Sequence, residues 1–418
     1  MKMLSTSILF FLLAFTMSFD VAVTTPRVTD IELTLPAGFK AETVVESLGR
    51  NRHLAVNSNG DIYIKLDKLK DGKGIMVLRL VDGKYKVVKS FGNYTGTGIC
   101  IKNNYLYATS DNAVYRYKFN NNEIINPDNP EIIVTGLVAG NQHASKSIAL
   151  DDKGNIYVNV GPPSNACQVA DRSAGSPGQD PCPLLEKTGG IWQFKTNQLN
   201  QSYNEGVRYA TGVRQIVGIS WNNKEDQLYA MQHGRDQLNN IAPQLYSNEQ
   251  SAELPSEEFL LIKKGSDFGW PYCYYDHLQK KKVLGPEYGG DGKKQGRCAD
   301  KEQPILGFPG HWAPNDLLFY TGKMFPEKYK NGAFIAFHGS WNRAPLKQAG
   351  YFVVFVPMKN GKPSGNYEIF ANGFTGKESI AGPGQAKYRP CGLAQGPDGA
   401  LYISDSKEGR IWKIVYGG

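Results

Sequence analysis

The chain has 418 residues, of which 41% are hydrophobic and 21% are charged, a balance typical of a folded globular protein and not of a disordered one. The formal net charge of +8 comes from scattered lysines and arginines, without a long basic run or a nucleic-acid-binding motif, so we expect no nucleic-acid partner. The 46 glycines and 23 tyrosines favour many short strands joined by tight turns.

The first twenty residues differ from the rest of the chain. Lys2 precedes an apolar stretch from Ile8 to Phe15 that is too short to span a bilayer. We therefore predict a cleaved signal peptide over residues 1–20, with an uncleaved anchor as the alternative. No later segment approaches the length of a membrane span, so we expect a soluble mature protein that is periplasmic or secreted.

The number of cysteines is consistent with an exported protein that contains disulfides. An even number of cysteines in an oxidising compartment indicates disulfides. A bridge between residues 167 and 182, and another between 273 and 298, would each close a long loop rich in proline and glycine, whereas a bridge between 100 and 391 requires the chain ends to come together. There is no CxxC or CxxCH motif, so neither a thiol redox centre nor an attached haem is expected. The six cysteines are Cys100, Cys167, Cys182, Cys273, Cys298 and Cys391.

One phrase recurs along the chain: an apolar run, a turn with Asp, Asn or Gly, and a strand that begins with an aromatic residue. Each copy is typical of a β-hairpin whose turn residues accept positive φ. A third strand follows several copies, at 113–119, 190–195, 351–357 and 410–416. The six copies cover 54–66, 99–110, 148–161, 219–234, a looser 318–340, and 393–406.

Three or four strands per unit at this spacing predict an all-β fold, a six-bladed β-propeller with four-stranded antiparallel blades. We expect residues 31–418 to form this propeller as a single domain. The segment 31–46 precedes the first unit and is expected to supply an outer strand to the last blade, which would close the ring. A β-sandwich or a pair of β domains is the alternative.

The residues just before each inner strand are the candidate site residues, because loops between blades converge on one face of the central channel. Those positions hold Arg52, His143, Arg214 and Arg389. Guanidinium groups are costly to bury without anions, so this group predicts a pocket for a polyanion with one titratable base. His143 is the candidate general base, with a hydrogen-bonded loop histidine as the alternative. Arg214 could hold a carboxylate or polarise a carbonyl, with a surface ion pair as the alternative.

Two further segments carry candidate ligand-binding groups. HGSWNR places Trp341, Asn342 and Arg343 together, where they could stack on a flat ligand and hydrogen-bond to it. MQHGRD (231–236) and PSEEF (255–259) offer backbone carbonyls and Glu257 or Glu258 to a hard cation such as calcium, with a solvated acidic loop as the alternative. HExxH, GxSxG, P-loop and GxGxxG motifs do not occur.

Taken together, these segments resemble the soluble pyrroloquinoline quinone (PQQ) dependent sugar dehydrogenases, related to soluble quinoprotein glucose dehydrogenase, and especially their sorbosone and pyranose dehydrogenase branch. HASKSIALDDKGNIYVNVG resembles the strand of the catalytic histidine, and RQIVGISWNNKEDQLYAMQHGRD the segment of the quinone-binding arginine. LLIKKGSDFGWPYC resembles the Gly-Trp-Pro motif, while HGSWNR and KYRPCGLAQGPDGALYISD resemble the cofactor-binding blades. The similarity runs from about Leu33 to the end.

The resemblance implies roles for individual residues. His143 would take the proton of the substrate hydroxyl, and Arg214 would hydrogen-bond to the quinone oxygen. The carbonyls of Gly234 and Arg235 would bind calcium. Some relatives orient the histidine with an aspartate at the place of Pro162, and Asn165 or Asp171 could replace it here. The implied cofactor-binding residues are Arg52, Arg214, His338, Trp341, Asn342, Arg343, Lys387 and Arg389.

The resemblance implies a PQQ- and calcium-dependent dehydrogenase of an aldose, a pyranose or an aldehyde-type sugar such as sorbosone. Electrons would pass to an external acceptor of the cytochrome or quinone type, because the chain encodes no haem or iron–sulfur ligands. One alternative is a calcium-dependent sugar lactonase on a six-bladed propeller, which needs several carboxylates converging on the metal. Another is a non-catalytic propeller that binds a protein or a glycan.

Overall fold

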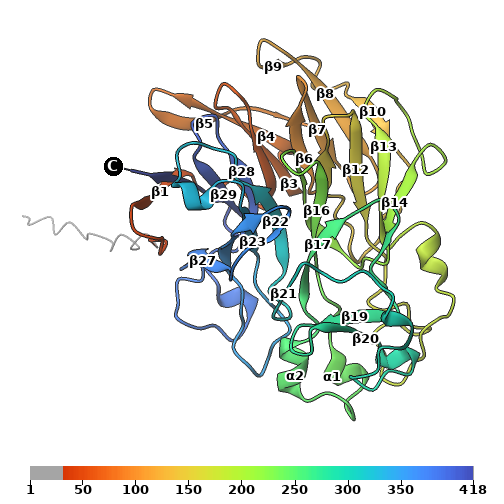
Figure 1. Ribbon diagram of the computed structural model, residues 1–418. Helices are drawn as coiled ribbons and strands as arrows, with labels where there is room; N and C mark the ends of the chain where they lie inside the picture. Colours follow the sequence, from red (N-terminus) through yellow and green to blue (C-terminus); the bar gives the residue numbers. More distant parts are fainter. Residues whose placement is uncertain (1–31, 418) are drawn as a thin grey trace, which may run out of the picture. The chain divides into compact units, whose positions relative to one another are not determined.

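The computed structural model describes residues 32–417, and strands dominate this part of the chain (Figure 1). Blade 1 contains β2 (Asn51–Val56), β3 (Ile62–Lys70), β4 (Lys73–Val81) and β5 (Lys84–Phe91). Blade 2 contains β6 (Ile99–Lys102), β7 (Tyr105–Thr109), β8 (Val114–Asn120) and β10 (Glu131–Val134), with β9 (Glu123–Ile124) paired to β8. Blade 3 contains β11 (Ile148–Leu150), β12 (Asn155–Val160), β13 (Gly190–Lys195) and β14 (Val207–Thr211), and β18 (Ser266–Asp267) adds to β14 in parallel.

The remaining three blades follow in chain order. Blade 4 contains β15 (Ile216–Asn222), β16 (Gln227–Gln232), β17 (Glu257–Ile262) and β21 (Leu306–Phe308). Blade 5 contains β22 (Pro314–Phe319), β23 (Ala333–Phe337), β24 (Phe352–Val356) and β27 (Glu368–Ala371). Blade 6 contains β28 (Pro390–Gln395), β29 (Leu401–Asp405), β30 (Ile411–Tyr416) and, from the start of the chain, β1 (Phe39–Val45).

Short elements lie in the connections. Two hairpins are formed by β19 (Cys273–Asp276) with β20 (Lys281–Leu284), and by β25 (Met358–Lys359) with β26 (Lys362–Pro363). The α-helices are α1 (Leu238–Ile241) and α2 (Asn248–Glu253). Single 3₁₀ turns cover Pro183–Glu186, Pro286–Tyr288, Gly296–Cys298, Glu327–Tyr329 and Pro383–Gln385.

The blades follow one another around a ring whose inner strands are neighbours in the order β2, β6, β11, β15, β22, β28 and β2 again. The prediction of a six-bladed propeller is therefore confirmed, and the sandwich alternative is wrong. Each recurring sequence phrase forms the first hairpin of one blade. β1 pairs antiparallel with β30, from Phe39 opposite Tyr416 to Val45 opposite Ile411, so the early segment completes the last blade as predicted.

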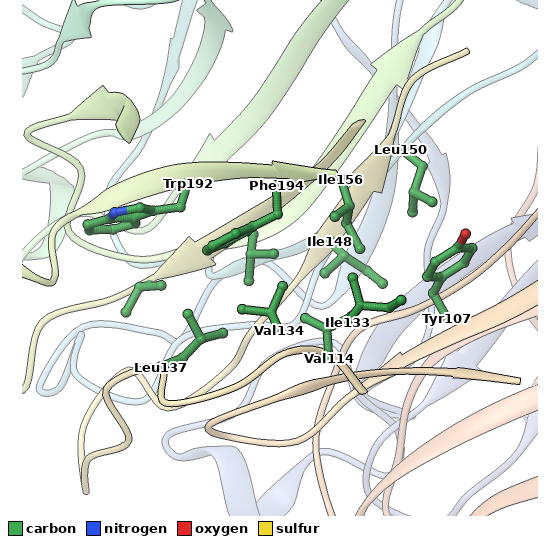
Figure 2. Close-up of a cluster of buried hydrophobic side chains, with 12 residues drawn as sticks. Tyr107, Val114, Ile133, Val134, Leu137, Ile148, Leu150, Ile156, Trp192 and Phe194 are labelled. Carbon is green, nitrogen blue, oxygen red and sulfur yellow. The ribbon is translucent and has the colours of Figure 1, made fainter. Parts of the chain in front are cut away.

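Apolar side chains between neighbouring blades make the core. Figure 2 shows one such cluster, in which Tyr107 and Ile133 of blade 2 lie beside Ile148 and Phe194 of blade 3. All six residues of β12 and all five of β23 are buried. Strands buried on both faces read as continuous apolar runs rather than as alternating ones, which is how the repeat phrases appear in the sequence.

Four of the inner strands have an irregularity in strand pairing near their first residues. β2, β15, β22 and β28 each shift register near their first residues. Neighbouring inner strands also approach closely there: a Cβ on Gly218 would lie 2.8 Å from the Asp316 carbonyl carbon, and one on Gly392 would lie 2.7 Å from the Arg52 carbonyl oxygen. Such bulges end regular pairing and re-aim side chains, and they position the residues described below.

Two of the anticipated disulfides are present, Cys167–Cys182 and Cys273–Cys298. Cys100 and Cys391 are both free, so the third possible disulfide is not formed. Cys100 lies on β6 and Cys391 on β28, and β2 separates these two strands in the ring. Among the described residues, no helix has the length and apolar character needed to cross a membrane. The predicted signal peptide, residues 1–20, lies outside the described part of the chain.

Candidate active site

Two adjoining cavities lie where the inner strands begin. The larger, here the central cavity, has a volume of about 480 Å³ and is lined by Arg52, His143, His338, Trp341 and Arg389 among others. The smaller, here the side cavity, has a volume of about 270 Å³ and is lined by residues that include His143, Arg214, Gly234, Trp341 and Asn342. His143 and Trp341 border both. The fold thus brings together most of the residues that were singled out from the sequence.

Two of the implied cofactor-binding residues lie elsewhere. Arg343 is buried, with Nη2 donating to Glu253 Oε1 at 2.6 Å and Nη1 donating to the Gly310 carbonyl oxygen at 3.1 Å. The Lys387 amino group lies 5.3 Å from the centre of the Tyr388 ring. Neither residue lines the central or the side cavity.

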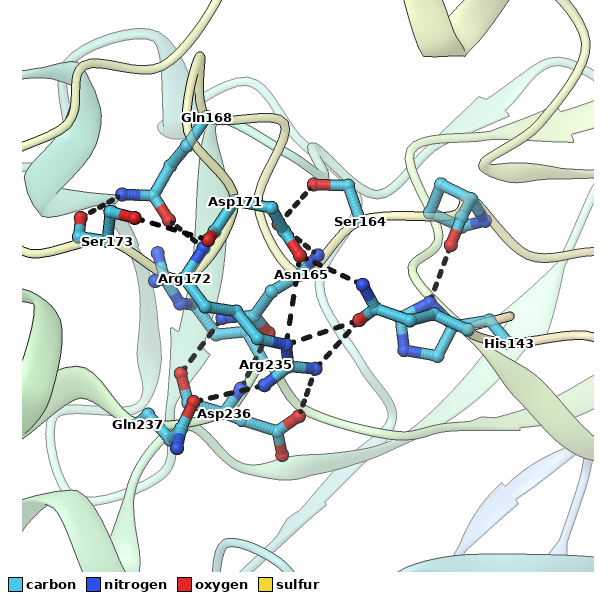
Figure 3. Close-up of polar contacts among 12 residues, drawn as sticks. His143, Ser164, Asn165, Gln168, Asp171, Arg172, Ser173, Arg235, Asp236 and Gln237 are labelled. Carbon is cyan, nitrogen blue, oxygen red and sulfur yellow. Dashed lines mark hydrogen bonds and ion pairs between the residues drawn. The ribbon is translucent and has the colours of Figure 1, made fainter. Parts of the chain in front are cut away.

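The orientation of His143 is fixed by a backbone carbonyl. Its Nδ1 lies 2.6 Å from the Pro162 carbonyl oxygen (Figure 3). Since a carbonyl oxygen only accepts, Nδ1 carries the proton and Nε2 keeps its lone pair. The Pro162 carbonyl therefore supplies the orienting contact that was expected from Asn165 or Asp171. Asn165 and Asp171 have other partners: Asn165 Nδ2 donates to the Asp236 carbonyl oxygen, and Asp171 Oδ2 accepts from Gln142.

His143 is neutral in this environment. Burial lowers its pKa from 6.5 to about 3, and the positive charge of Arg214 acts in the same direction. A neutral imidazole with a free Nε2 at a cavity wall can accept a proton from a bound hydroxyl group.

Arg214 is held in a network of buried charge. Its Nη2 donates to Asp236 Oδ2 at 2.8 Å, its Nη1 to the Gly234 carbonyl oxygen at 2.9 Å, and its Nε to the Asn165 carbonyl oxygen at 3.3 Å. Arg172 Nη2 donates to the same Asp236 oxygen at 2.9 Å. Burial alone would raise the pKa of Asp236, but the neighbouring cations hold it below its usual range.

Sequence reasoning missed Asp236 and Arg172. Asp236 ends the MQHGRD segment, which was considered only for its carbonyl groups. Arg172 lies in the loop closed by Cys167 and Cys182, and its contact with Asp236 depends on how that loop folds back onto blade 4 (Figure 3). No pattern in the sequence pointed to it.

Two guanidinium groups at the central cavity have no carboxylate partner. Within the described residues, neither Arg52 nor Arg389 makes an ion pair: Arg52 Nε donates to Thr97 Oγ1 at 3.3 Å, and Arg389 Nε and Nη2 donate to the carbonyls of His338 and Gly339 at 3.1 and 2.6 Å. Asp67 and Asp111 also line this cavity, but neither forms an ion pair with Arg52 or Arg389, whose unpaired guanidinium groups suit an anionic ligand.

The TrAA12-like family model matches residues 33–416, nearly all of the described chain. The chain belongs to the TrAA12-like family.

Relatives of this TrAA12-like protein include enzymes. A pyrroloquinoline quinone-dependent pyranose dehydrogenase from Coprinopsis cinerea is 27% identical over 287 residues, which cover 58% of this chain and 37% of that protein. The holo form of the PQQ domain of pyranose dehydrogenase from the same organism has a TM-score of 0.73 at 20% identity, covering 92% of this chain and 97% of that one. The calcium structure of the AA12 enzyme of Trichoderma reesei has a TM-score of 0.75 at 18% identity. The match covers 94% of this chain and 98% of that one. At these identities the structural likeness establishes the fold.

Of the two residues implied as calcium ligands of the TrAA12-like chain, Arg235 lines neither cavity, and the carbonyl oxygen of Gly234 is only partly free. Gly234 borders the side cavity, but its carbonyl oxygen already accepts from Arg214. Glu257 borders the same cavity, where burial raises its pKa to about 8 and its oxygens accept from the backbone N–H groups of Gly234 and Ala313. Across residues 32–417, no group of three or more His, Cys, Asp or Glu side chains could hold a metal, so the converging carboxylates that a lactonase needs are not found there.

Acid is expected to destabilise the TrAA12-like chain at unusually mild pH. The pKa of His143 is lowered to about 3 and that of His233 to about 4, both mainly by burial, and burial also lowers the pKa values of His311 and His338. Between about pH 4 and 6.5 the unfolded histidines bind protons that the folded ones do not. The stability from these groups is therefore present above pH 6.5 and lost as the pH falls, by up to about 1.4 kcal/mol per pH unit for each histidine.

Glu257 opposes this trend, because its raised pKa lets the folded state bind a proton as the pH falls below 8. Burial also raises the pKa values of Asp111, Asp316 and Asp405, which opposes the trend as well, but unfolded aspartates titrate at about pH 4, below this window. The four histidines therefore dominate, and we expect the melting temperature to fall from pH 6.5 to pH 4.5. His311→Gln should make this decline shallower. A melting temperature that stays constant over the window would contradict the assignment of neutral buried histidines.

Proposed function

We propose that this protein is a PQQ-dependent oxidoreductase that oxidises a sugar. The observation that carries the proposal is the juxtaposition, around one cavity, of a neutral histidine with a free Nε2 and two guanidinium groups without carboxylate partners. The named activity of the Coprinopsis relative supports it.

The residues present fit such a cofactor. PQQ is flat and carries three carboxylates. Arg52 and Arg389 would bind carboxylate groups, and the half-exposed ring of Trp341 would pack against the flat rings. Asn342 Oδ1 is buried without a hydrogen-bond partner at the side cavity, where a ligand could satisfy it. Bound PQQ would supply a two-electron acceptor for a hydride from the sugar.

The chain's own groups would move the proton. His143 Nε2 accepts it from the substrate hydroxyl, while the Pro162 carbonyl keeps Nδ1 protonated and the ring in place. Arg214, fixed by Asp236, provides a positive charge that favours negative charge developing nearby during the reaction. Asp236 therefore acts as a positioning residue for Arg214.

The finer assignments are part of the same proposal. The substrate is an aldose, a pyranose or a sorbosone-like aldehyde, as the name of the Coprinopsis relative suggests for pyranoses. Electrons would leave to an external acceptor. The mature protein would work in the periplasm or outside the cell, in line with the predicted signal peptide.

The proposal is tested on the purified protein without cofactor. PQQ binding is followed by calorimetry, and dye reduction is followed with a panel of aldoses and osones. We expect tight PQQ binding and sugar-dependent dye reduction. Absence of both would overturn the proposal, and hydrolysis of sugar lactones without PQQ would favour a lactonase.

Loss of one unpaired guanidinium group should weaken PQQ binding. Arg389→Gln removes a charge-assisted contact to a carboxylate, and we expect the Kd for PQQ to rise about 10- to 100-fold. Arg297→Gln is the matched control, because Arg297 is 46% exposed and pairs with Asp180 away from both cavities. An unchanged Kd in Arg389→Gln would show that Arg389 does not bind PQQ.

Calcium is expected to bind tightly only together with PQQ. The Gly234 carbonyl oxygen has one lone pair left after its contact with Arg214, and nearby side chains do not complete a calcium site. Calorimetric titration should therefore show weak calcium binding to the protein alone and at least about tenfold tighter binding with PQQ, whose own oxygens would add ligands. Tight binding to the protein alone would contradict this expectation.

A further inference from the structure

A third cavity lies between blades 1 and 2, where residues of β4, β8 and β10 line it; these strands are labelled in Figure 1. Its volume is about 440 Å³, close to that of the central cavity. Tyr94, Tyr115 and Tyr117 line it, together with Ile132 and two prolines. We call it the tyrosine cavity; the proposed oxidation makes no use of it.

The tyrosine wall is held rigidly. The rings of Tyr94 and Tyr115 stack with their centres 4.2 Å apart, and the hydroxyl groups of Tyr94 and Tyr117 are hydrogen-bonded at 2.8 Å. Lys65 Nζ lies 4.1 Å from the centre of the Tyr94 ring and donates to the Tyr94 carbonyl oxygen at 2.5 Å. Lys65 is fully buried, and burial lowers its pKa to about 7. Burying an amino group is costly, and here it fixes one tyrosine in place.

Polar groups complete the cavity. Asn93, Asp128 and Asn129 line it and are exposed to solvent. The Asp128 carboxylate is 3.6 Å from Lys73 Nζ, a loose contact that leaves lone pairs available. Lys65 and Tyr115 cover the Tyr94 ring and Tyr117 is buried, so Tyr115 is the ring on which a ligand would stack. An aromatic ring beside amide and carboxylate groups matches a pyranose, which presents C–H groups on its faces and hydroxyl groups around its edge.

One chain segment borders both the tyrosine cavity and the central cavity. Gly92, Asn93 and Tyr94 line the former, and Thr95, Gly96 and Thr97 line the latter. A carbohydrate chain crossing this segment could occupy both cavities. We propose that the tyrosine cavity is a second carbohydrate-binding site, which binds a neutral pyranose unit of an oligosaccharide independently of PQQ.

Binding is tested on the cofactor-free protein made in a bacterial host, so that Asn93 of the NYT sequence is unmodified. Tyrosine rings labelled with ¹³C are observed by NMR during titration with maltohexaose, cellohexaose and glucose. We expect at least one hexasaccharide to shift the Tyr94, Tyr115 and Tyr117 resonances, and to bind more tightly than glucose.

Two variants locate the site. Tyr115→Ala removes a ring face and should raise the Kd at least about fivefold, while Tyr115→Phe keeps the ring and should stay near the unmodified protein. Ile132→Trp fills the cavity from the edge strand β10, where residue 132 lies opposite Tyr115, and it keeps all three tyrosines. It should abolish the shifts even if Tyr115→Ala folds poorly. Dye reduction is not needed, so failure of the proposed oxidation leaves this test intact. Absence of tyrosine shifts with all three sugars, or unchanged affinity in Ile132→Trp, would overturn the proposal.

Discussion

His143→Asn is expected to lower turnover of the PQQ-loaded enzyme by at least about a hundredfold, the scale on which a general base contributes. Asparagine tolerates the left-handed backbone of residue 143, whose φ is 53°, better than alanine does. Its amide can also donate to the Pro162 carbonyl oxygen. What it lacks is the lone pair of the ring nitrogen, so the variant isolates proton transfer from folding.

The measurement is kcat by dye reduction at saturating sugar, with PQQ affinity measured in parallel. His277→Asn is the matched control, because His277 lies outside both cavities and hydrogen-bonds to Ser256. We expect His277→Asn to retain full turnover. If His143→Asn also retained it, another group would have to be the base.

Glu287→Ala is expected to reduce the free energy of unfolding by about 3–5 kcal/mol, the usual cost of leaving a buried charge without its partner. Arg235 and Glu287 form a two-point ion pair, and their side chains are only 4% and 1% exposed. The pair fastens the segment that carries Gly234 and Asp236 to the turn at Pro286–Tyr288. Urea denaturation monitored by tryptophan fluorescence gives the change.

A double variant tests whether the loss of stability comes from the unpaired buried charge of Arg235. Arg235→Met with Glu287→Leu removes both charges and should recover most of the lost stability, because the apolar replacements avoid the desolvation penalty. Glu327→Ala is the control for an exposed pair: Glu327 is 83% exposed, contacts Lys330 at 2.5 Å, and should cost less than about 1 kcal/mol. A loss that small in Glu287→Ala would show that water reaches Arg235.

The propeller could be predicted from the sequence because each blade repeats one local pattern. Turn residues with positive φ, such as Asn103 and Asn104, join apolar strands at regular spacing, and this information lies within a few residues. The closing strand was also predictable, since residues 31–46 precede the first repeat. The parallel addition of β18 to β14 was not, because that contact joins distant segments.

The candidate site was predictable to the extent that it sits at equivalent places in the repeats. Arg52, His143 and Arg389 line the central cavity because they precede or begin inner strands. Arg343 also follows a strand of the ring, but its guanidinium group binds Glu253 on α2 and does not line the central cavity. The partner of His143 escaped prediction for a different reason: a backbone carbonyl can replace a side chain, and any residue type supplies one.

The pairing of β1 with β30 has a consequence for how the protein forms. The last blade joins residues 39–45 to residues 411–416, so the ring stays open until nearly the whole chain is available. Until then both partners expose unpaired strand edges, which are prone to wrong pairing. Contacts this distant in sequence also slow folding. We therefore expect closure of blade 6 to be the late, committing event, and a chain shortened past Val45 to aggregate rather than to fold with a three-stranded last blade.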